Sequence, residues 1–195
     1  MNARQQALSA SHEIRREEVA DAAVRLVTRA GLEKVTIREV AHELGYSTTV
    51  VSHYFKNKKE LLFYTYRAAA RRSQVRFDAA RAAAPGDLQA CLEVFLPLDA
   101  DRRRDWRVWL AFWGMAIGDP DFTAEQRRQV VEARASVKTV LQALNLSVET
   151  GPDRAARRLL TAVIGIAVQA TFDAKDWSTS RQRAALGEEI EHWSP

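Results

Sequence analysis

The sequence predicts an all-α protein, and three observations support this class. Glycine and proline are sparse, with 8 and 5 of the 195 residues. The strict alternation of apolar and polar residues that marks exposed β-strands is rare, whereas alanine, leucine, arginine and glutamate, all good helix formers, are abundant. Apolar residues recur at spacings of three and four, so nearly every segment between the glycine and proline breaks is typical of an amphipathic helix.

The first predicted helix runs from Ser11 or His12 to Ala30. Gly31 follows as its end, because glycine adopts the left-handed backbone that closes a helix without strain. The residues expected to pack inward share three- and four-residue spacing: Val19, Ala23, Leu26, Val27 and Ala30.

Two short helices are predicted next. Thr36 begins the second helix, with Glu39 three residues on in a capping-box pattern, and Gly45 ends it. Ser47 caps the third helix, because its hydroxyl can accept a hydrogen bond from a free backbone amide. The apolar faces consist of Ile37, Val40, Ala41 and Leu44 in the second helix, and of Val51 and Phe55 in the third.

A long fourth helix is expected from Lys58 toward Ala83, with a second capping pattern at Asn57 and Glu60. Pro85 and Gly86 stop it. Five more helices are predicted at residues 87–96, 102–117, 123–144, 153–172 and 180–193, with breaks at Pro97, Asp119-Pro120, Gly151-Pro152 and residues 176–178.

Charge, cysteine content and hydropathy exclude several classes. The net charge of +4 permits a polyanionic partner without requiring one. Cys91 is the single cysteine, so no intrachain disulfide or multi-cysteine zinc site can form, and we expect a cytoplasmic protein. The first 18 residues mix arginine and glutamate without an apolar core, so we expect no signal peptide. The longest apolar stretch, 159–172, is shorter than the roughly 20 residues of a membrane-spanning helix.

No pattern of catalytic or metal-binding residues is present. Paired carboxylates, a Ser-His-Asp arrangement and a phosphate-binding glycine loop are all missing from the sequence. We therefore expect no enzyme, no cofactor, no metal site and no membrane partner. The four histidines are scattered along the chain: His12, His42, His53 and His192.

Residues 36–55 have the sequence form of a helix-turn-helix. Two short amphipathic helices are separated by Gly45 and Tyr46, and the longer first helix can brace them. The second of the two leaves small polar side chains exposed, whose size suits base edges and phosphates in a major groove about 12 Å wide. The alternative is a helical protein-interaction module that binds no DNA. The exposed set comprises Tyr46, Ser47, Thr48, Thr49, Ser52 and His53.

The segment TIREVAHELGYSTTVVSHYFKNKKELL, residues 36–62, resembles the DNA-binding domain of the TetR family of transcriptional regulators, and its SHYF run is similar to the BetI branch. The resemblance implies a DNA-binding regulator, usually a repressor. It makes Thr36, Tyr54 and Lys58 phosphate contacts and places residues 48, 49, 52 and 53 at base edges. The full set of predicted DNA-binding residues is Thr36, Arg38, Tyr46, Ser47, Thr48, Thr49, Ser52, His53, Tyr54, Lys56, Lys58 and Lys59.

Two features of this segment leave alternatives open. Many family members have glycine where this chain has Thr49 and tyrosine where it has Ser52, so the operator sequence is not predicted. The lysines at 56, 58 and 59 lie where backbone phosphates are expected, but a solvated helix start would also carry them.

The resemblance also implies the domain organisation: a three-helix helix-turn-helix domain at residues 11–60, joined to a larger helical bundle at 61–195 that binds a ligand and dimerises. We expect a double-stranded DNA operator, a homodimer and an unidentified small-molecule effector. One short recognition helix reads only a few base pairs, whereas two copies about 34 to 36 Å apart read a palindrome.

Two apolar faces of the second domain are candidate sites. The segment WRVWLAFWGMA, residues 106–116, is similar to C-terminal domains of BetI-like members, and its aromatic face could hold a quaternary ammonium by cation–π attraction. We favour core packing, which produces the same spacing. The candidate ligand residues are Trp106, Trp109, Phe112 and Trp113, and the candidate dimer residues, for which an internal core helix is the alternative, are Leu160, Ile164 and Val168.

Overall fold

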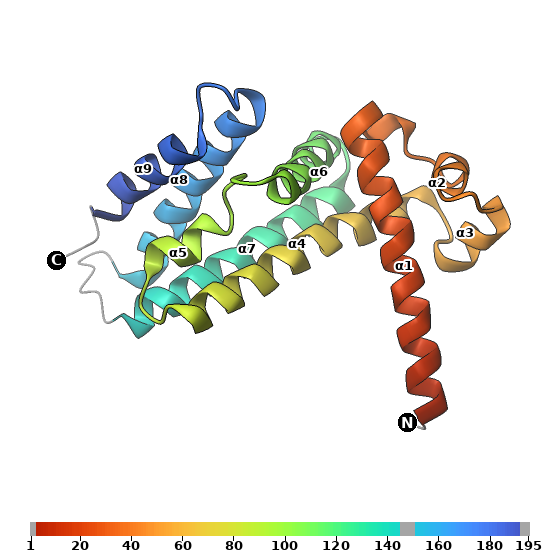
Figure 1. Cartoon of the computed structure of the whole chain (residues 1–195), viewed down its shortest axis with the longest axis horizontal. Helices are drawn as coiled ribbons and strands as arrows, with labels where there is room; N and C mark the ends of the chain where they lie inside the picture. Colours follow the sequence, from red (N-terminus) through yellow and green to blue (C-terminus); the bar gives the residue numbers. More distant parts are fainter. Residues whose placement is uncertain (1–2, 145–150, 192–195) are drawn as a thin grey trace. The chain divides into compact units, whose positions relative to one another are not determined.

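All regular structure is helical in the computed structural model, which describes residues 3–144 and 151–191, with side chains from residue 10 on (Figure 1). The predicted all-α class is confirmed for this part of the chain. In chain order the elements are α1 (Ala3–Ala30), the 3-10 turn η1 (Leu32–Lys34), α2 (Ile37–Leu44), α3 (Thr48–Tyr54), α4 (Lys58–Ala83), α5 (Leu88–Glu93), α6 (Ala100–Ala116), α7 (Pro120–Ala143), α8 (Pro152–Phe172) and α9 (Thr179–Glu191).

The chain divides into two compact units. Unit 1 consists of Met1–Ala69 and Arg107–Phe122, and unit 2 of Ala70–Trp106 and Thr123–Pro195. Helices α4, α6 and α7 therefore each contribute residues to both units. The expected boundary between residues 60 and 61 separates a DNA-binding domain from a regulatory domain, whereas the two units are defined by packing alone. The functional boundary therefore stays a prediction.

Local signals place the ends of α2 and α3. The Thr36 hydroxyl accepts a hydrogen bond from the Glu39 amide at 3.1 Å, and the Ser47 hydroxyl accepts one from the Val50 amide at 3.4 Å. Gly45 adopts φ 68°, the left-handed backbone that a side chain would strain. Each cap satisfies an amide that has no partner inside its helix, so these short helices begin and end where the sequence predicts.

The start of α4 follows the predicted cap with one difference. The Asn57 side chain accepts a hydrogen bond from the Glu60 amide at 2.9 Å, as expected. The Glu60 carboxylate, however, accepts from the Lys56 amide at 2.9 Å rather than from Asn57. The reciprocal bond of the capping box therefore reaches one residue further back, and it still satisfies an amide in the turn before the helix.

Four predicted boundaries differ from the structure by two residues or more, and the predicted end of the last helix at residue 193 lies outside the described residues. Helix α7 begins at Pro120 rather than at residue 123, because proline is well tolerated in the first turn of a helix. Helix α1 begins at Ala3 rather than at residue 11 or 12, because residues 3–10 contain good helix formers and neither glycine nor proline. The predicted helix at 87–96 ends at Glu93, before Pro97, which disfavours helical backbone in the residue that precedes it. Helix α6 begins at Ala100 rather than Arg102, because Asp99 accepts the Arg102 amide hydrogen bond at 2.8 Å.

The core of unit 1 packs α1, α2 and α3 around the first turns of α4 and the end of α6. Aromatic rings fill its centre. Phe112 stacks on Tyr66 with ring centroids 3.8 Å apart, and Phe63 stacks on Phe122 at 4.6 Å. Helix α3 is thus held by a rigid apolar scaffold while its other side faces solvent.

Unit 2 contains a buried ion pair between α4 and α6. Both oxygens of Asp105, whose side chain is 2 % exposed, accept hydrogen bonds from guanidinium groups, at 2.5 Å from Arg72 and 2.8 Å from Arg76. Next to it, the indole of Trp106 donates to the Phe95 carbonyl at 2.7 Å. A buried carboxylate requires such partners, because an isolated charge in the interior is very costly.

Helix α8 is, among the helices that the structure describes, the only one long and apolar enough to span a membrane. Its apolar face is nevertheless buried inside the protein, and α9 packs beside it. This pattern is that of a core helix. The buried residues are Ala155, Ala156, Leu159, Leu160, Val163, Ile166, Ala167 and Ala170.

Candidate DNA-binding surface

The turn between α2 and α3 is built by three residues, Gly45, Tyr46 and Ser47. The amide of Gly45 donates to the His42 carbonyl at 3.1 Å, and the amide of Tyr46 donates to the Ala41 carbonyl at 2.9 Å. Both bonds satisfy carbonyl groups in the last turn of α2, and the chain reverses direction sharply after it. Helix α1 packs against both short helices, so unit 1 has the braced helix-turn-helix that the sequence predicts.

Helix α3 presents a polar face to solvent. Val51 and Phe55 are fully buried, and Tyr54 is half-buried. Val50 is 41 % exposed on the polar side, and its methyl groups can contact a thymine methyl in a major groove. Val50 is missing from the predicted site because an apolar residue in a short helix is normally assigned to the core. The predicted residues that lie exposed here are Ser47, Thr48, Thr49, Ser52 and His53.

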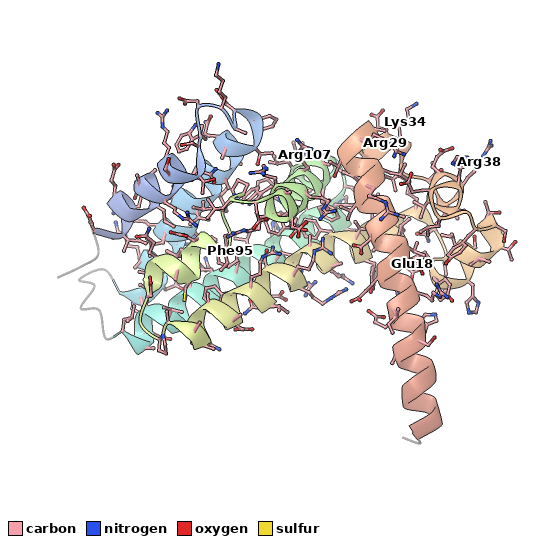
Figure 2. All side chains as sticks on the ribbon, viewed as in Figure 1. Glu18, Arg29, Lys34, Arg38, Phe95 and Arg107 are labelled. Atoms are coloured by element: carbon pink, nitrogen blue, oxygen red, sulfur yellow. The ribbon has the colours of Figure 1, made fainter. Side chains whose placement is uncertain are left out.

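Two predicted contacts lie at the first turn of α2. The Thr36 side chain is exposed, and its hydroxyl, which accepts the cap bond from Glu39, keeps its own hydrogen for a phosphate. Arg38 extends from α2 into solvent (Figure 2) and has no ion-pair partner among the described side chains. Both groups are therefore available to an anion.

Tyr46 is more constrained than its sequence position suggests. Its hydroxyl donates to Glu18 of α1 at 3.0 Å and accepts a hydrogen bond from Arg15 at 3.0 Å. The bond to Glu18 raises the pKa of Tyr46, and the bond from Arg15 lowers the pKa of Glu18. The phenol therefore ties the turn to α1, and a DNA contact through its hydroxyl competes with these two bonds.

The three lysines around the start of α4 have different environments. Lys56 is exposed, and its ammonium has no partner among the described residues. The Lys58 ammonium donates to the backbone carbonyls of Leu32 and Glu33, both at 3.2 Å. Lys58 therefore holds the connection between α1 and α2, a structural role that the sequence does not indicate.

Lys59 is bound by two carboxylates. Its ammonium lies 3.1 Å from Asp119 and 2.7 Å from Asp121. The hydrogen bonds to Asp121 and then Asp119 raise the pKa of Lys59, and the bond from Lys59 lowers the pKa of Asp119. These carboxylates lie 60 and 62 residues further along the chain, which is why the sequence offers no sign of the ion pairs.

His12 of α1 adds an unpredicted residue to this surface. Its ring centroid lies 6.0 Å from that of His53 and 5.0 Å from that of Tyr54. Both histidines are exposed. The last turn of α3 is therefore flanked by an aromatic side chain of α1. In the sequence, the only sign of this contact is that the first helix contains a histidine.

The predicted aromatic ligand face is largely packed. Trp106 and Phe112 are 3 % and 1 % exposed, which agrees with the favoured core interpretation. Trp109 and Trp113 are half-buried, and the Trp113 indole donates to the Tyr66 hydroxyl at 3.4 Å. Trp106 belongs to unit 2 and the other three rings to unit 1.

The outer face of α8 is the candidate dimer surface. Leu160 is 6 % exposed and packs inside the chain, whereas Ile164 and Val168 are half-buried. Gly165 is exposed, and a Cβ atom there would meet no atom within 4 Å. The fully outward stripe, at helical spacing, consists of Thr161, Gly165, Gln169 and Phe172.

Two family models match the chain. Residues 19–65 match the model of bacterial regulatory proteins of the tetR family, and residues 84–194 match the C-terminal model of BetI-type transcriptional repressors. Both are families of regulators, which agrees with the expectation that the chain is not an enzyme.

Curated relatives are regulators of the same kind. The HTH-type transcriptional regulator BetI of Burkholderia mallei is 34% identical over 119 residues, 59% of this chain and 61% of that protein. The alignment thus spans about three fifths of the BetI relative's length. The HTH-type transcriptional regulator PksA of Bacillus subtilis is 26% identical over 185 residues, 92% of this chain and 90% of that protein.

Solved structures with the same fold cover nearly the whole chain. A transcriptional regulator from Rhodococcus sp. Rha1 is similar with a TM-score of 0.82 and 27% identity, over 91% of this chain and 95% of that one. A transcriptional regulator from Saccharomonospora viridis in complex with choline has a TM-score of 0.72 and 25% identity, over 92% and 97%.

Proposed function

Because the chain belongs to the TetR family of bacterial regulatory proteins and carries a BetI-type C-terminal domain, we propose that it represses transcription by binding a palindromic operator as a homodimer. The single observation that carries the proposal is α3, a short capped helix in a braced helix-turn-helix whose outer side is polar. Residues 11–60 form the DNA-binding domain and 61–195 the regulatory domain in this proposal, and the protein acts in the cytoplasm.

The DNA contacts divide into two kinds. Thr48, Thr49, Ser52 and His53 read base edges, because they project from the exposed side of α3. Thr36, Arg38, Tyr54 and the lysines position the backbone, because hydroxyl and cationic groups are the usual phosphate partners. Of the lysines, Lys56 is the strongest candidate, since its ammonium has no competing partner among the described residues.

The homodimer forms through α8 in this proposal. Its outward stripe contains Gly165, where the missing side chain allows another helix to approach closely. Phe172 at its end is 78 % exposed, and in this proposal its ring adds apolar area to the contact with the partner. Ile164 and Val168 flank the stripe, while Leu160 supports it from inside the chain.

A small-molecule effector releases the operator by favouring a different spacing of the two recognition helices. A coupling of about 1 to 3 kcal/mol is typical of such linkage. The relative in complex with choline supports a quaternary ammonium compound as the effector class. Of the four predicted ligand residues, Trp109 and Trp113 are the two that are half-buried rather than buried. Each ring could contribute about 0.5 to 2 kcal/mol of cation–π attraction.

Fluorescence anisotropy tests the DNA-binding part of the proposal. The chain's own upstream DNA and a scrambled duplex are titrated with protein at two salt concentrations. Wild type should bind the upstream duplex more tightly than the scrambled one, and binding should weaken with salt. Lys56→Ala should weaken binding to both duplexes, whereas Ser52→Ala should reduce the preference between them.

Lys175→Ala is the matched control, because it removes the same charge from an exposed position of unit 2. If the measured affinity does not depend on salt, on the duplex sequence or on the Lys56→Ala substitution, a helical interaction module that binds no DNA is favoured instead. The effector class is tested by adding choline, or ethanolamine as the primary-amine control, to the preformed complex. Release by choline alone supports the quaternary ammonium assignment, and release by neither removes it.

A further inference from the structure

The ammonium of Lys59 has all its donors directed at carboxylates. An ammonium carries three N–H donors, and three carboxylate oxygens surround this one: the two oxygens of Asp119 at 3.3 and 3.1 Å, and one oxygen of Asp121 at 2.7 Å. A phosphate oxygen would be a fourth acceptor. Lys59 can therefore bind a DNA phosphate only by giving up at least one of these bonds.

The carboxylate of Asp119 is held in place independently of Lys59. Asp119 precedes α7, and one of its oxygens accepts hydrogen bonds from the amides of Asp121 at 2.9 Å and Phe122 at 3.3 Å. The negative charge therefore lies at the helix N-terminus, where the helix dipole stabilises it. The Phe122 ring, 5.5 Å from the Lys59 ammonium, packs in the core of unit 1.

Lys59 itself has room to move. Its side chain is 41 % exposed, and Lys59 and Asp121 line one open cleft of about 440 Å³ within unit 1. The lysine side chain has four rotatable bonds, so the ammonium can leave the carboxylates while its backbone stays in α4. The neighbouring Lys56 has no such restraint among the described residues.

We propose that Asp119 and Asp121 restrain Lys59 and thereby limit the affinity of the protein for its operator. This inference rests on the proposed DNA-binding function. In the free protein the ammonium is neutralised by two carboxylates, Asp119 just before α7 and Asp121 in its first turn. Binding to DNA exchanges them for a phosphate. The two aspartates are positioning residues, because they act on DNA through Lys59.

The test measures operator affinity by fluorescence anisotropy over a series of salt concentrations. The variants are Asp119→Asn, Asp121→Asn and the double variant, each with Lys59 and with Lys59→Met. Asparagine keeps the cap of α7, since it is as good a capping residue as aspartate. The melting temperature of each variant shows that folding is intact.

The double aspartate variant should bind the operator roughly three- to tenfold more tightly than wild type, because exposed ion pairs of this kind restrain a side chain only modestly. The slope of log affinity against log salt should stay nearly unchanged, because Lys59 contacts the same phosphate in both complexes, whereas Lys59→Met should make the slope shallower by about 0.9. In the Lys59→Met background the same aspartate substitutions should change affinity by less than about twofold. Glu17→Gln, which removes one exposed carboxylate of α1, should also change it by less than about twofold.

The outcomes separate this inference from the function on which it rests. If wild type binds no DNA specifically, both fail. If wild type binds its operator but the aspartate variants bind equally or more weakly, only the restraint is wrong. An equal gain with and without Lys59 would show a general charge effect and would also overturn it.

Discussion

The ring of His12 in α1 lies 6.0 Å from the ring of His53 in α3, and the two planes stand at 73°. Tyr54 completes the contact, with its ring 5.0 Å from His12 and 5.2 Å from His53. Edge-to-face arrangements of this kind are favourable for aromatic rings. The side chain of His53, which the proposed function places at a base edge, is therefore oriented by a residue of the first helix.

We expect His12→Ala to weaken operator binding roughly two- to fivefold, because one aromatic contact of about 0.5 to 1 kcal/mol is lost. The melting temperature should change little, since His12 is exposed. Anisotropy titrations measure the first quantity and thermal unfolding the second. His42→Ala, an exposed histidine of α2, is the control, and an equal loss in both variants would refute a specific role for His12.

Contacts within a few residues could be predicted from the sequence. The caps at Thr36 and Ser47 and the left-handed Gly45 depend on residues three or four positions apart, and all three lie as expected. The exposed face of α3 follows from helical periodicity alone. The helix class and the helix-turn-helix were therefore predictable, because local backbone chemistry determines them.

Contacts between distant segments could not be predicted. Lys59 and Asp121 are 62 residues apart, and Tyr46 and Glu18 are 28 apart. Each pair forms only after the helices pack, so no spacing rule applies to it. The sequence therefore indicates which residues carry charge or a hydroxyl, but the packing decides which of them remain available to DNA.

Gly45→Ala should destabilise the protein by about 1 to 2 kcal/mol, the cost of a side chain in left-handed backbone. A methyl group there would meet no atom within 4 Å, so the φ of 68° is the only source of strain. Gly114→Ala in α6 is the matched control, because its surroundings are equally open and its backbone is helical. That variant should gain about 0.5 to 1 kcal/mol. Urea unfolding measures both, and equal shifts would contradict the argument.

Asp105→Asn should destabilise the protein by about 3 to 5 kcal/mol, because it leaves two partly buried guanidinium groups without their carboxylate. Asp101→Asn removes an exposed carboxylate that pairs with Arg104 in the same helix, and it should cost less than about 1 kcal/mol. Chemical unfolding at neutral pH compares the two. Similar losses would mean that the charge of Asp105 contributes no more than a surface ion pair.

Stability should fall at acid pH through the carboxylates of unit 1. Hydrogen bonds from Arg29 and Arg25 lower the pKa of Glu43, and one from Arg15 lowers that of Glu18. A lowered folded-state pKa adds stability that is complete above the unfolded value, about 4.3 for glutamate, and is lost as the pH falls through the folded value. The free energy of unfolding should therefore be level near neutrality and decline below about pH 4.

Glu43→Gln provides the check on this pH dependence. The variant should be less stable than wild type at pH 7, where the charge of Glu43 joins α1 to α2 at 3.2 Å from Arg25 and 2.8 Å from Arg29. The difference should shrink as the pH is lowered, because wild type then loses the same charge. Urea unfolding at a series of pH values measures it. A difference that persists at the acid end would show that Glu43 acts by packing instead.

Gly165→Leu tests the proposed dimer surface. A Cβ atom at this position meets no atom within 4 Å in the single chain, and the position is exposed. Leucine also favours helix more than glycine does, so the fold should be retained or slightly stabilised. Across a close helix–helix contact the same side chain would collide with the partner. We therefore expect sedimentation velocity to show a shift from dimer to monomer, with operator affinity at least about tenfold weaker, because each monomer reads only a half-site.

Ala135→Leu, at an exposed position of α7, is the control and should leave the dimer intact. A Gly165→Leu protein that stays dimeric would move the interface away from the outer face of α8, and a wild type that is monomeric at micromolar concentration would remove the dimer from the proposed function.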